Sequence, residues 1–338
     1  MSQNKLITIF IYLAPILLIY SCSLKRTAIG ADNEIRVICS EIDKPIVSQY
    51  LESIFTDTLY TPQSEPYYHL KYTEPSNYNK LKSQNQVIIA AIEQNNGNPG
   101  YNLIKQLLPE DQFDSMVKGD PIIFAKDVNA YNQLFMIINA RSKDQLLLTV
   151  RDKKNFIRQQ YFEQFKQRQM KYIFGDDRNK NLEDSLRTIF GWSIKIPWGW
   201  DVIQIDEENQ FVWIGKEMPF QWIGISWRNE NIVDEELKVG EYIWQWPTEH
   251  YGTIQLSDYK FKLNKATFNN QNAWRATGIW ETINVKDAKG GPFCSYIFYD
   301  EYNNRTFHMN YLIHHPGNDK SIFMRQLDMV VRSISIPR

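Results

Sequence analysis

The sequence predicts an α+β protein of two domains: an N-terminal α/β domain and a C-terminal antiparallel sheet covered by helices, an α-β-α sandwich-like arrangement. Three observations lead to this prediction. The 338 residues exceed the usual size of one domain. All 10 tryptophans lie between Trp192 and Trp280. The apolar pattern also changes from helical runs mixed with buried strands to regular alternation. The polar stretch 174–180 places the boundary there, giving domains 34–177 and 178–338.

The first 21 residues have the pattern of an export signal. Lys5 precedes an uncharged apolar run over residues 6–20, which has the length of a signal's apolar core and is short for a membrane span. The run ends in Ser21 and Cys22, which resembles a bacterial lipoprotein cleavage box and predicts that Cys22 carries the lipid. An ordinary signal peptide or an uncleaved anchor is the alternative. Residues 22–33 are then expected to form a short tether.

The first domain is predicted to alternate buried strands with helices. The runs 87–92 and 134–138 are apolar at every position, which is typical of strands in a sheet covered on both faces. Helical spacing follows in the last stretch, where Ile157, Tyr161 and Phe165 form one stripe. In chain order we expect a strand at 35–40, a helix from 43, a strand at 87–92, helices at 102–108 and 109–117, a strand at 134–138 and a long basic helix at 142–172.

The second domain is predicted to contain antiparallel strands with one covered and one wetter face. Trp274, Ala276, Gly278 and Trp280 alternate with more polar residues, and the strand at 306–314 alternates in the same way. The turn 316–318 then begins a final helix with an apolar side. We expect this helix to occupy the groove that Ala276 and Gly278 leave between the two tryptophans.

Motifs for catalysis, cofactors and metals are missing from the sequence. It contains no nucleophile elbow, no Walker loop, no dinucleotide fingerprint and no zinc spacing. We therefore assign no catalytic residue, no cofactor-binding residue and no metal ligand. The loop 95–100 follows a strand and precedes a helix, but it lacks the lysine and glycine spacing of a phosphate cradle. All five histidines are expected to face solvent.

Tryptophan is the unusual resource of this sequence. Indole rings stack on sugars and peptides, so Trp198, Trp200, Trp244 and Trp246 form a candidate ligand platform. Trp244 and Trp246 are expected to share one strand face with Tyr242. The alternative is that these rings fill the core or cover the sheet.

Charge and cysteine usage limit the partners. The chain has 38 basic and 39 acidic residues, so no net field indicates nucleic acid. Residues 151–172 are basic and residues 201–241 are acidic. A basic helix on an anchored protein can lie on anionic lipid or bind an acidic partner, although an outer helix face without function is the default. If Cys22 is acylated, Cys39 and Cys294 remain, each in an apolar run typical of a buried free thiol.

Two resemblances extend this interpretation. Residues 27–40, 61–68 and 191–200 resemble an uncharacterised Bacteroidota lipoprotein family of unknown function, over nearly the whole mature chain. That resemblance implies a lipid-anchored envelope protein and supplies no activity or site residues. The strand–Pro–x–Gly–Trp opening at 197–200 and the Pro316-Gly317 turn before the last helix are similar to PsbP/Mog1-type sandwich domains. The second resemblance bears on the fold of the C-terminal half only.

The sequence thus predicts a lipid-anchored cell-envelope protein, facing the periplasm at the outer membrane, with a non-enzymatic role in binding or assembly. Its expected partners are the membrane, through the lipid on Cys22, and an envelope protein or glycan; nucleic acid is not expected. A carbohydrate- or peptidoglycan-binding module that uses exposed tryptophans is one alternative. An unrecognised hydrolase is the other.

Overall fold

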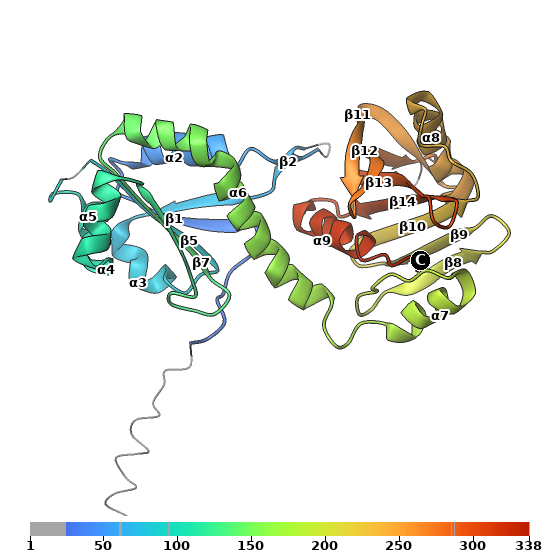
Figure 1. The fold of residues 1–338 in the computed structure, drawn as a ribbon, viewed down its shortest axis with the longest axis horizontal. Helices are drawn as coiled ribbons and strands as arrows, with labels where there is room; N and C mark the ends of the chain where they lie inside the picture. Colours follow the sequence, from blue (N-terminus) through green and yellow to red (C-terminus); the bar gives the residue numbers. More distant parts are fainter. Residues whose placement is uncertain (1–24, 61–62, 94, 285, 287, 338) are drawn as a thin grey trace, which may run out of the picture. The chain divides into compact units, whose positions relative to one another are not determined.

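A computed structural model describes residues 25–60, 63–93, 95–284, 286 and 288–337 (Figure 1). The predicted signal segment and Cys22 lie outside the described residues. The chain divides into two compact units. The described part of the first unit comprises residues 25–31, 35–45 and 71–146, and that of the second comprises 32–34, 46–70 and the chain from 147 onwards.

The first unit is built on a mixed sheet. Its strand order is β4 (His69–Thr73), β1 (Glu34–Ile38), β5 (Gln86–Ile92), β7 (Leu134–Ala140) and β6 (Ile122–Lys126). The β1–β5 and β5–β7 pairs are parallel, whereas β6 runs antiparallel to β7. Every residue of β5 and β7 is buried, which confirms the prediction from their unbroken apolar runs.

Helices cover one face of this sheet. Tyr101 and Ile104 of α4 (Pro99–Leu107) pack with Phe113 and Met116 of α5 (Glu110–Lys118) against the side chains of β5 and β7. Two short helical turns, η1 (Pro75–Asn77) and α3 (Tyr78–Leu81), precede β5. The loop before α4 supplies its cap, because Asn98 accepts hydrogen bonds from the backbone N–H groups of residues 100 and 101.

The expected tether is wrong for residues 25–31. Thr27 forms a parallel bridge to Tyr131, Ile29 forms one to Gln84, and Ala28 between them is buried. The backbone N–H of Ala28 donates to the Tyr131 carbonyl at 2.8 Å. Because strand-like pairing satisfies the backbone of this segment, it lies along the first unit even though its composition is that of a linker.

The predicted long basic helix forms as α6 (Lys143–Ile173), but from residue 147 onward it belongs to the second unit and not to the expected N-terminal domain 34–177. Its predicted stripe of Ile157, Tyr161 and Phe165 is fully buried. Phe55, which follows α2 (Lys44–Ile54), packs edge-on against Tyr161 with ring centroids 4.9 Å apart. Among the described residues no helix has both the length and the apolar character needed to cross a bilayer.

The second unit contains a seven-stranded antiparallel sheet, which confirms the predicted fold class. The strand order is β11 (Ile254–Phe268), β12 (Gln271–Thr282), β13 (Gly290–Asp300), β14 (Arg305–His314), β10 (Phe220–Arg228), β9 (Phe211–Lys216) and β8 (Asp201–Asp206). Three helices accompany it: α7 (Lys180–Phe190), α8 (Glu236–Tyr251) and α9 (Ser321–Val331). A short hairpin of β2 (Thr58–Leu59) and β3 (Glu65–Pro66) also belongs to this unit.

Helices pack on both faces of this sheet, so the expected wetter face is wrong. One apolar cluster joins α7 and α9 to side chains such as Met309 and Tyr311, and a second joins α8 to the opposite face (Figure 1). Thr306, His308 and Asn310, which were expected on the wetter face, are buried. Rings of α8 cover His308 and Asn310, and Thr306 donates to the carbonyl oxygen of Glu230 in the segment before α8.

The placement of the final helix also differs from expectation. Trp274 and Trp280 face α8 and pack with Ile243 and Trp246. The last helix, α9, packs against β14 and β10 on the opposite face. The alternation of β12 correctly separates its two faces, but periodicity alone does not say which helix covers which face.

Candidate functional site

The predicted tryptophan platform does not form as one surface. Trp200 and Trp246 are only 3% and 0% exposed, so they belong to the core and cannot stack on a ligand. Trp198 and Trp244 are 77% and 41% exposed. The segment that contains Trp244 and Trp246 is part of helix α8 and not a strand, so these rings point in different directions.

Trp198 lies beside a small polar pocket. The pocket has a volume of about 370 Å³ and includes Trp198 and Gly199 in its lining. Asn179 supports its floor, because the side-chain amide donates to the carbonyl oxygen of Trp200 at 3.2 Å and the side-chain oxygen caps α7. Asp177, Lys180, Asn181 and Asp201 supply further polar groups to the lining. Of the four predicted rings, Trp198 alone combines an exposed fraction of 77% with an adjacent pocket.

The expectation that all histidines face solvent is wrong for His308. This residue is 1% exposed, because the rings of Trp246 and Tyr242 on α8 cover it at centroid distances of 4.5 and 5.5 Å. Neither ring nitrogen has a hydrogen-bond partner. Burial lowers the pKa of His308 well below 6.5, and the nearby His250 and Arg228 lower it further. His308 is therefore neutral at physiological pH.

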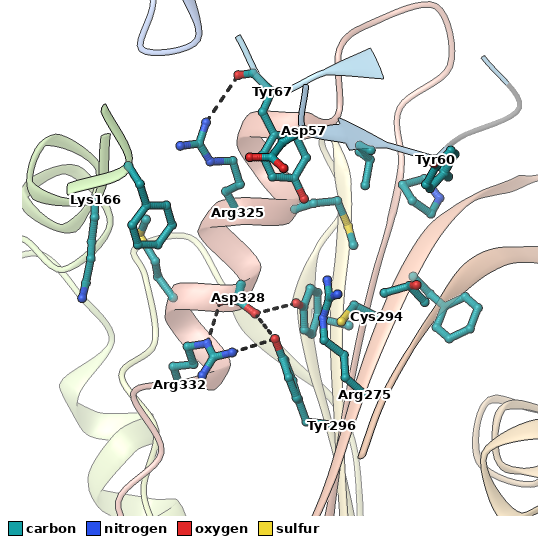
Figure 2. A pocket seen from close by; sticks show the side chains of 18 of the residues that line it. Asp57, Tyr60, Tyr67, Lys166, Arg275, Cys294, Tyr296, Arg325, Asp328 and Arg332 are labelled. Atoms are coloured by element: carbon teal, nitrogen blue, oxygen red, sulfur yellow. Dashed lines mark hydrogen bonds and ion pairs between the residues drawn. The ribbon is translucent and has the colours of Figure 1, made fainter. Parts of the chain in front are cut away.

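A much larger cavity lies on the α9 side of the sheet, where sequence reasoning placed no site. Because α9 packs over β14 and β10, it does not cover the same face of β11 and β12. The cavity has a volume of about 1060 Å³, and all of its lining residues belong to the second unit (Figure 2). We call it the β11–β12 cavity.

Strand register explains which side chains form its floor. Lys262 of β11 lies opposite Thr277, which lies opposite Cys294, and Cys294 lies opposite Tyr311. Since side chains directly opposite one another share a face, this row lines the cavity together. The next row on that face runs from Asn264 through Arg275 to Tyr296.

A carboxylate with three hydrogen-bond donors lies at the end of the cavity near α9. Asp328 accepts hydrogen bonds from the hydroxyls of Tyr296 at 3.0 Å and Tyr311 at 2.7 Å, and from Nε of Arg332 at 2.7 Å. Arg332 also donates to the Tyr296 hydroxyl at 2.7 Å, as Figure 2 shows. Burial raises the pKa of both tyrosines, which therefore remain protonated donors. These three donors make Asp328 a hydrogen-bond acceptor that joins α9 to β13 and β14.

The other acidic group and the thiol of the lining are similarly constrained. Asp57 forms an ion pair with Arg158. Burial raises the pKa of the Cys294 thiol, so this cysteine is a neutral thiol and not a nucleophilic thiolate. Among the described residues no group of three or more histidine, cysteine or acidic side chains is arranged to hold a metal ion.

Cations dominate the rest of the polar lining. Five cationic side chains of the lining form no ion pair within the described chain: Lys166, Lys195, Lys260, Lys262 and Arg275. The ammonium groups of Lys260 and Lys262 lie 5.5 and 4.9 Å from the ring centre of Tyr60. Arg275 is half-buried, and Figure 2 shows it beside Cys294. The cavity therefore has an excess of positive charge that the protein does not neutralise.

The opposite wall of the cavity is apolar. Phe162, Met170 and Phe174 of the α6 region follow one another at multiples of four residues, and Met324 and Met329 of α9 continue the surface. Phe162 and Met170 are 44% and 39% exposed, which is unusual for two large apolar side chains on one helical stripe. Chemically, the arrangement can attract an anion on one side and cover apolar surface on the other.

Comparison with known proteins adds a domain match. Residues 178–333 match a family model described as a domain of unknown function, DUF4837. This match covers the tryptophan-rich part of the chain and agrees with the expectation of an uncharacterised domain. No curated protein matches the sequence. Membership of a Bacteroidota lipoprotein family stays a prediction.

Several solved structures are similar to part of the chain. The Ran-binding protein Mog1p of Saccharomyces cerevisiae is 10% identical over 44% of this chain and 92% of its own, with a TM-score of 0.32. LpqN of Mycobacterium tuberculosis, described as involved in cell envelope biogenesis, is 12% identical over 44% of this chain and 83% of its own, with a TM-score of 0.27. A Bacteroides thetaiotaomicron protein is 8% identical over 44% of this chain, with a TM-score of 0.27, and the match spans 45% of that protein.

Proposed function

We propose that this chain is a lipid-anchored cell-envelope protein that acts by binding and not by catalysis, and that the β11–β12 cavity binds an anionic ligand. The apolar N-terminal run that ends at Cys22 supports the anchor, and with it a periplasm-facing position at the outer membrane. The three hydrogen bonds that Asp328 already accepts and the neutral thiol of Cys294 favour binding over chemistry. The alternative of an unrecognised hydrolase stays a prediction without a proposed site.

The main evidence for an anionic ligand is Arg275, which is half-buried and has no carboxylate partner among the described residues. A half-buried guanidinium loses hydration, and this loss is normally offset by a carboxylate at short range. Arg275 has no such partner among the described residues, and Lys262 and Lys260 lie on the neighbouring strand of the same cavity. An anionic ligand would supply the missing countercharge to all three.

Titration of the detergent-solubilised full chain with inorganic pyrophosphate tests this function. We expect saturable binding by calorimetry at constant ionic strength, and Lys262→Gln should weaken it by about threefold or more. Lys265→Gln is the matched control, because Lys265 is an exposed lysine of the same strand that lies over Trp274 on the other face. Equal losses in the two variants, or no binding at all, would show that the cavity does not bind anions.

Trp198 supports a second candidate function, a carbohydrate- or peptidoglycan-binding surface. Its ring is 77% exposed beside the pocket of about 370 Å³, an arrangement suited to stacking on a sugar face. Chito-oligosaccharides should quench the tryptophan fluorescence of the wild-type protein and should lose this effect in Trp198→Ala. Unchanged quenching in the variant would exclude Trp198 as the platform. As a control, Trp198→Ala should bind pyrophosphate as tightly as the wild-type protein does.

A further inference from the structure

We infer that the ligand of the β11–β12 cavity is an anionic amphiphile, with its phosphate or carboxylate headgroup at the cationic strands and its apolar chain along α6 and α9. This inference rests on the proposed function and names the class of ligand. It follows from the chemical difference between the two walls of one cavity.

The apolar wall of the cavity indicates that the ligand has an apolar part, which an inorganic anion lacks. The side chains of Phe162, Met170 and Met329 line the cavity without being fully covered by protein. Exposed apolar area of this kind is stabilised when a ligand removes it from water. Methionine side chains are flexible and polarisable, so they adapt well to an alkyl chain with many conformers.

The cationic wall of the cavity indicates that the ligand has an anionic group, which an uncharged lipid lacks. A neutral apolar ligand would displace water from Arg275 and Lys262 and would supply no countercharge, which is unfavourable. An acidic headgroup placed over the row from Asn264 to Arg275 would reach guanidinium, ammonium and amide donors together. Headgroup and chain therefore have separate places in the same cavity.

The size of the cavity agrees with a ligand that has both parts. Small-molecule sites usually have volumes of about 300–1,000 Å³. At about 1060 Å³ this cavity slightly exceeds that range and is far larger than one phosphate or carboxylate group. An acidic segment of a protein partner is the other occupant that charge alone would allow, and the experiment below distinguishes it.

A chain-length series tests the inference. The probes are butyl, hexyl and octyl phosphate and the carboxylates of matching length, all below their micelle concentrations, with octanol as the uncharged comparison. Affinity should rise with chain length in both headgroup series, by up to about fourfold for each methylene that becomes buried. Octanol should bind at least tenfold more weakly than octyl phosphate. The two series also show whether phosphate or carboxylate is the preferred headgroup.

Matched variants connect the effect to the two walls. Phe162→Ala should reduce the gain from butyl to octyl phosphate by about tenfold and leave pyrophosphate binding unchanged. Phe156→Ala is the control, because Phe156 is a 52% exposed phenylalanine of the same helix that does not line the cavity. Lys262→Gln should weaken every anionic probe by a similar factor.

The possible outcomes distinguish failure of the amphiphile inference from failure of the proposed anion binding. If pyrophosphate binds in a Lys262-dependent way but affinity does not change with chain length, the amphiphile is excluded and the anion site remains. If no anion binds, both proposals are wrong. If a glutamate-rich peptide binds more tightly than octyl phosphate and competes with it, the cavity is a site for an acidic protein segment and the inference is overturned.

Discussion

Replacing His308 with leucine should make the second unit less sensitive to acid without reducing its stability at neutral pH. His308 is a buried histidine whose two ring nitrogens have no hydrogen-bond partner. Its pKa is lowered well below 6.5 by burial, and further by His250 and Arg228. An unpartnered polar group costs about 1–3 kcal/mol on burial, so an apolar side chain of similar size should be neutral or stabilising.

The sign and size of the acid effect follow from proton linkage. The unfolded chain takes up a proton on His308 below its ordinary pKa of 6.5, whereas the folded protein, with its lowered pKa, does not. The contribution of His308 to stability is therefore complete above pH 6.5 and decreases as the pH falls. Between about one pH unit above and one below that value, the loss is about 1.4 kcal/mol. His250, whose pKa is also lowered mainly by burial, adds a loss of the same sign.

Urea denaturation at about pH 7.5 and at about pH 5.5, followed by tryptophan fluorescence, measures this effect. All 10 tryptophans lie between residues 192 and 280, so the signal reports the second unit. His308→Leu should lose about 1.4 kcal/mol less than the wild type on acidification, while the His250 contribution cancels in the comparison. His308→Gln is the control, since it removes titration but keeps an unpartnered polar group. If His308→Leu retains the whole acid effect, or unfolds at neutral pH, the reasoning about this residue is wrong.

Three further predictions concern other parts of the chain. Trp280→Ala should cost about 3–5 kcal/mol in urea denaturation, because the ring is 1% exposed and its N–H donates to the Ile313 carbonyl; Trp198→Ala should stay within about 0.5 kcal/mol. Asp328→Asn should cost about 2 kcal/mol in the same assay, since it weakens three charge-assisted hydrogen bonds, and a loss near zero would contradict the network. Cys22→Ala should abolish labelling by a fatty-acid probe, and equal label in the variant would exclude lipidation at this residue.

Local patterns predicted some of the individual elements but not others, such as β4, β6, β8 and β11. Unbroken apolar runs identified β5 and β7, and helical spacing identified α6 almost to its ends. The main failure was the segment around Trp244, which was predicted as a strand but lies inside helix α8, even though this helix contains Pro247. Tyr242 and Trp246 are four residues apart, so on a helix they face the sheet together and cover His308. Tertiary burial of these rings outweighs the low helix propensity of the segment.

The candidate site was harder to predict because its residues are distant in sequence. Lys262, Arg275 and Cys294 come together through strand register, and Phe162 reaches the same cavity from another helix. The alternation of lysine with apolar residues from Lys260 to Leu263 is the one local signal, and it is equally typical of a solvated edge strand. The tryptophan content led instead to the predicted ligand platform, although most of these rings are buried and stabilise the core.

The geometry of a wide sheet explains why a cavity forms at this place. A helix is about 10 Å across and strands are about 4.8 Å apart, so one helix covers roughly two strands. α9 packs on β14 and β10 and reaches Tyr296 of β13, and α7 with the segment that follows it shares an apolar cluster with β9. Neither helix therefore covers the cavity face of β11 and β12. Exposed lysines on β11 would suffice to keep an open edge strand soluble. They do not explain Arg275, which lies one strand further in, is half-buried and has no carboxylate partner among the described residues. A solvated edge and a ligand site therefore differ at Arg275: in a solvated edge Arg275→Gln would leave pyrophosphate affinity unchanged, whereas in a ligand site it should lower that affinity more than Lys262→Gln does.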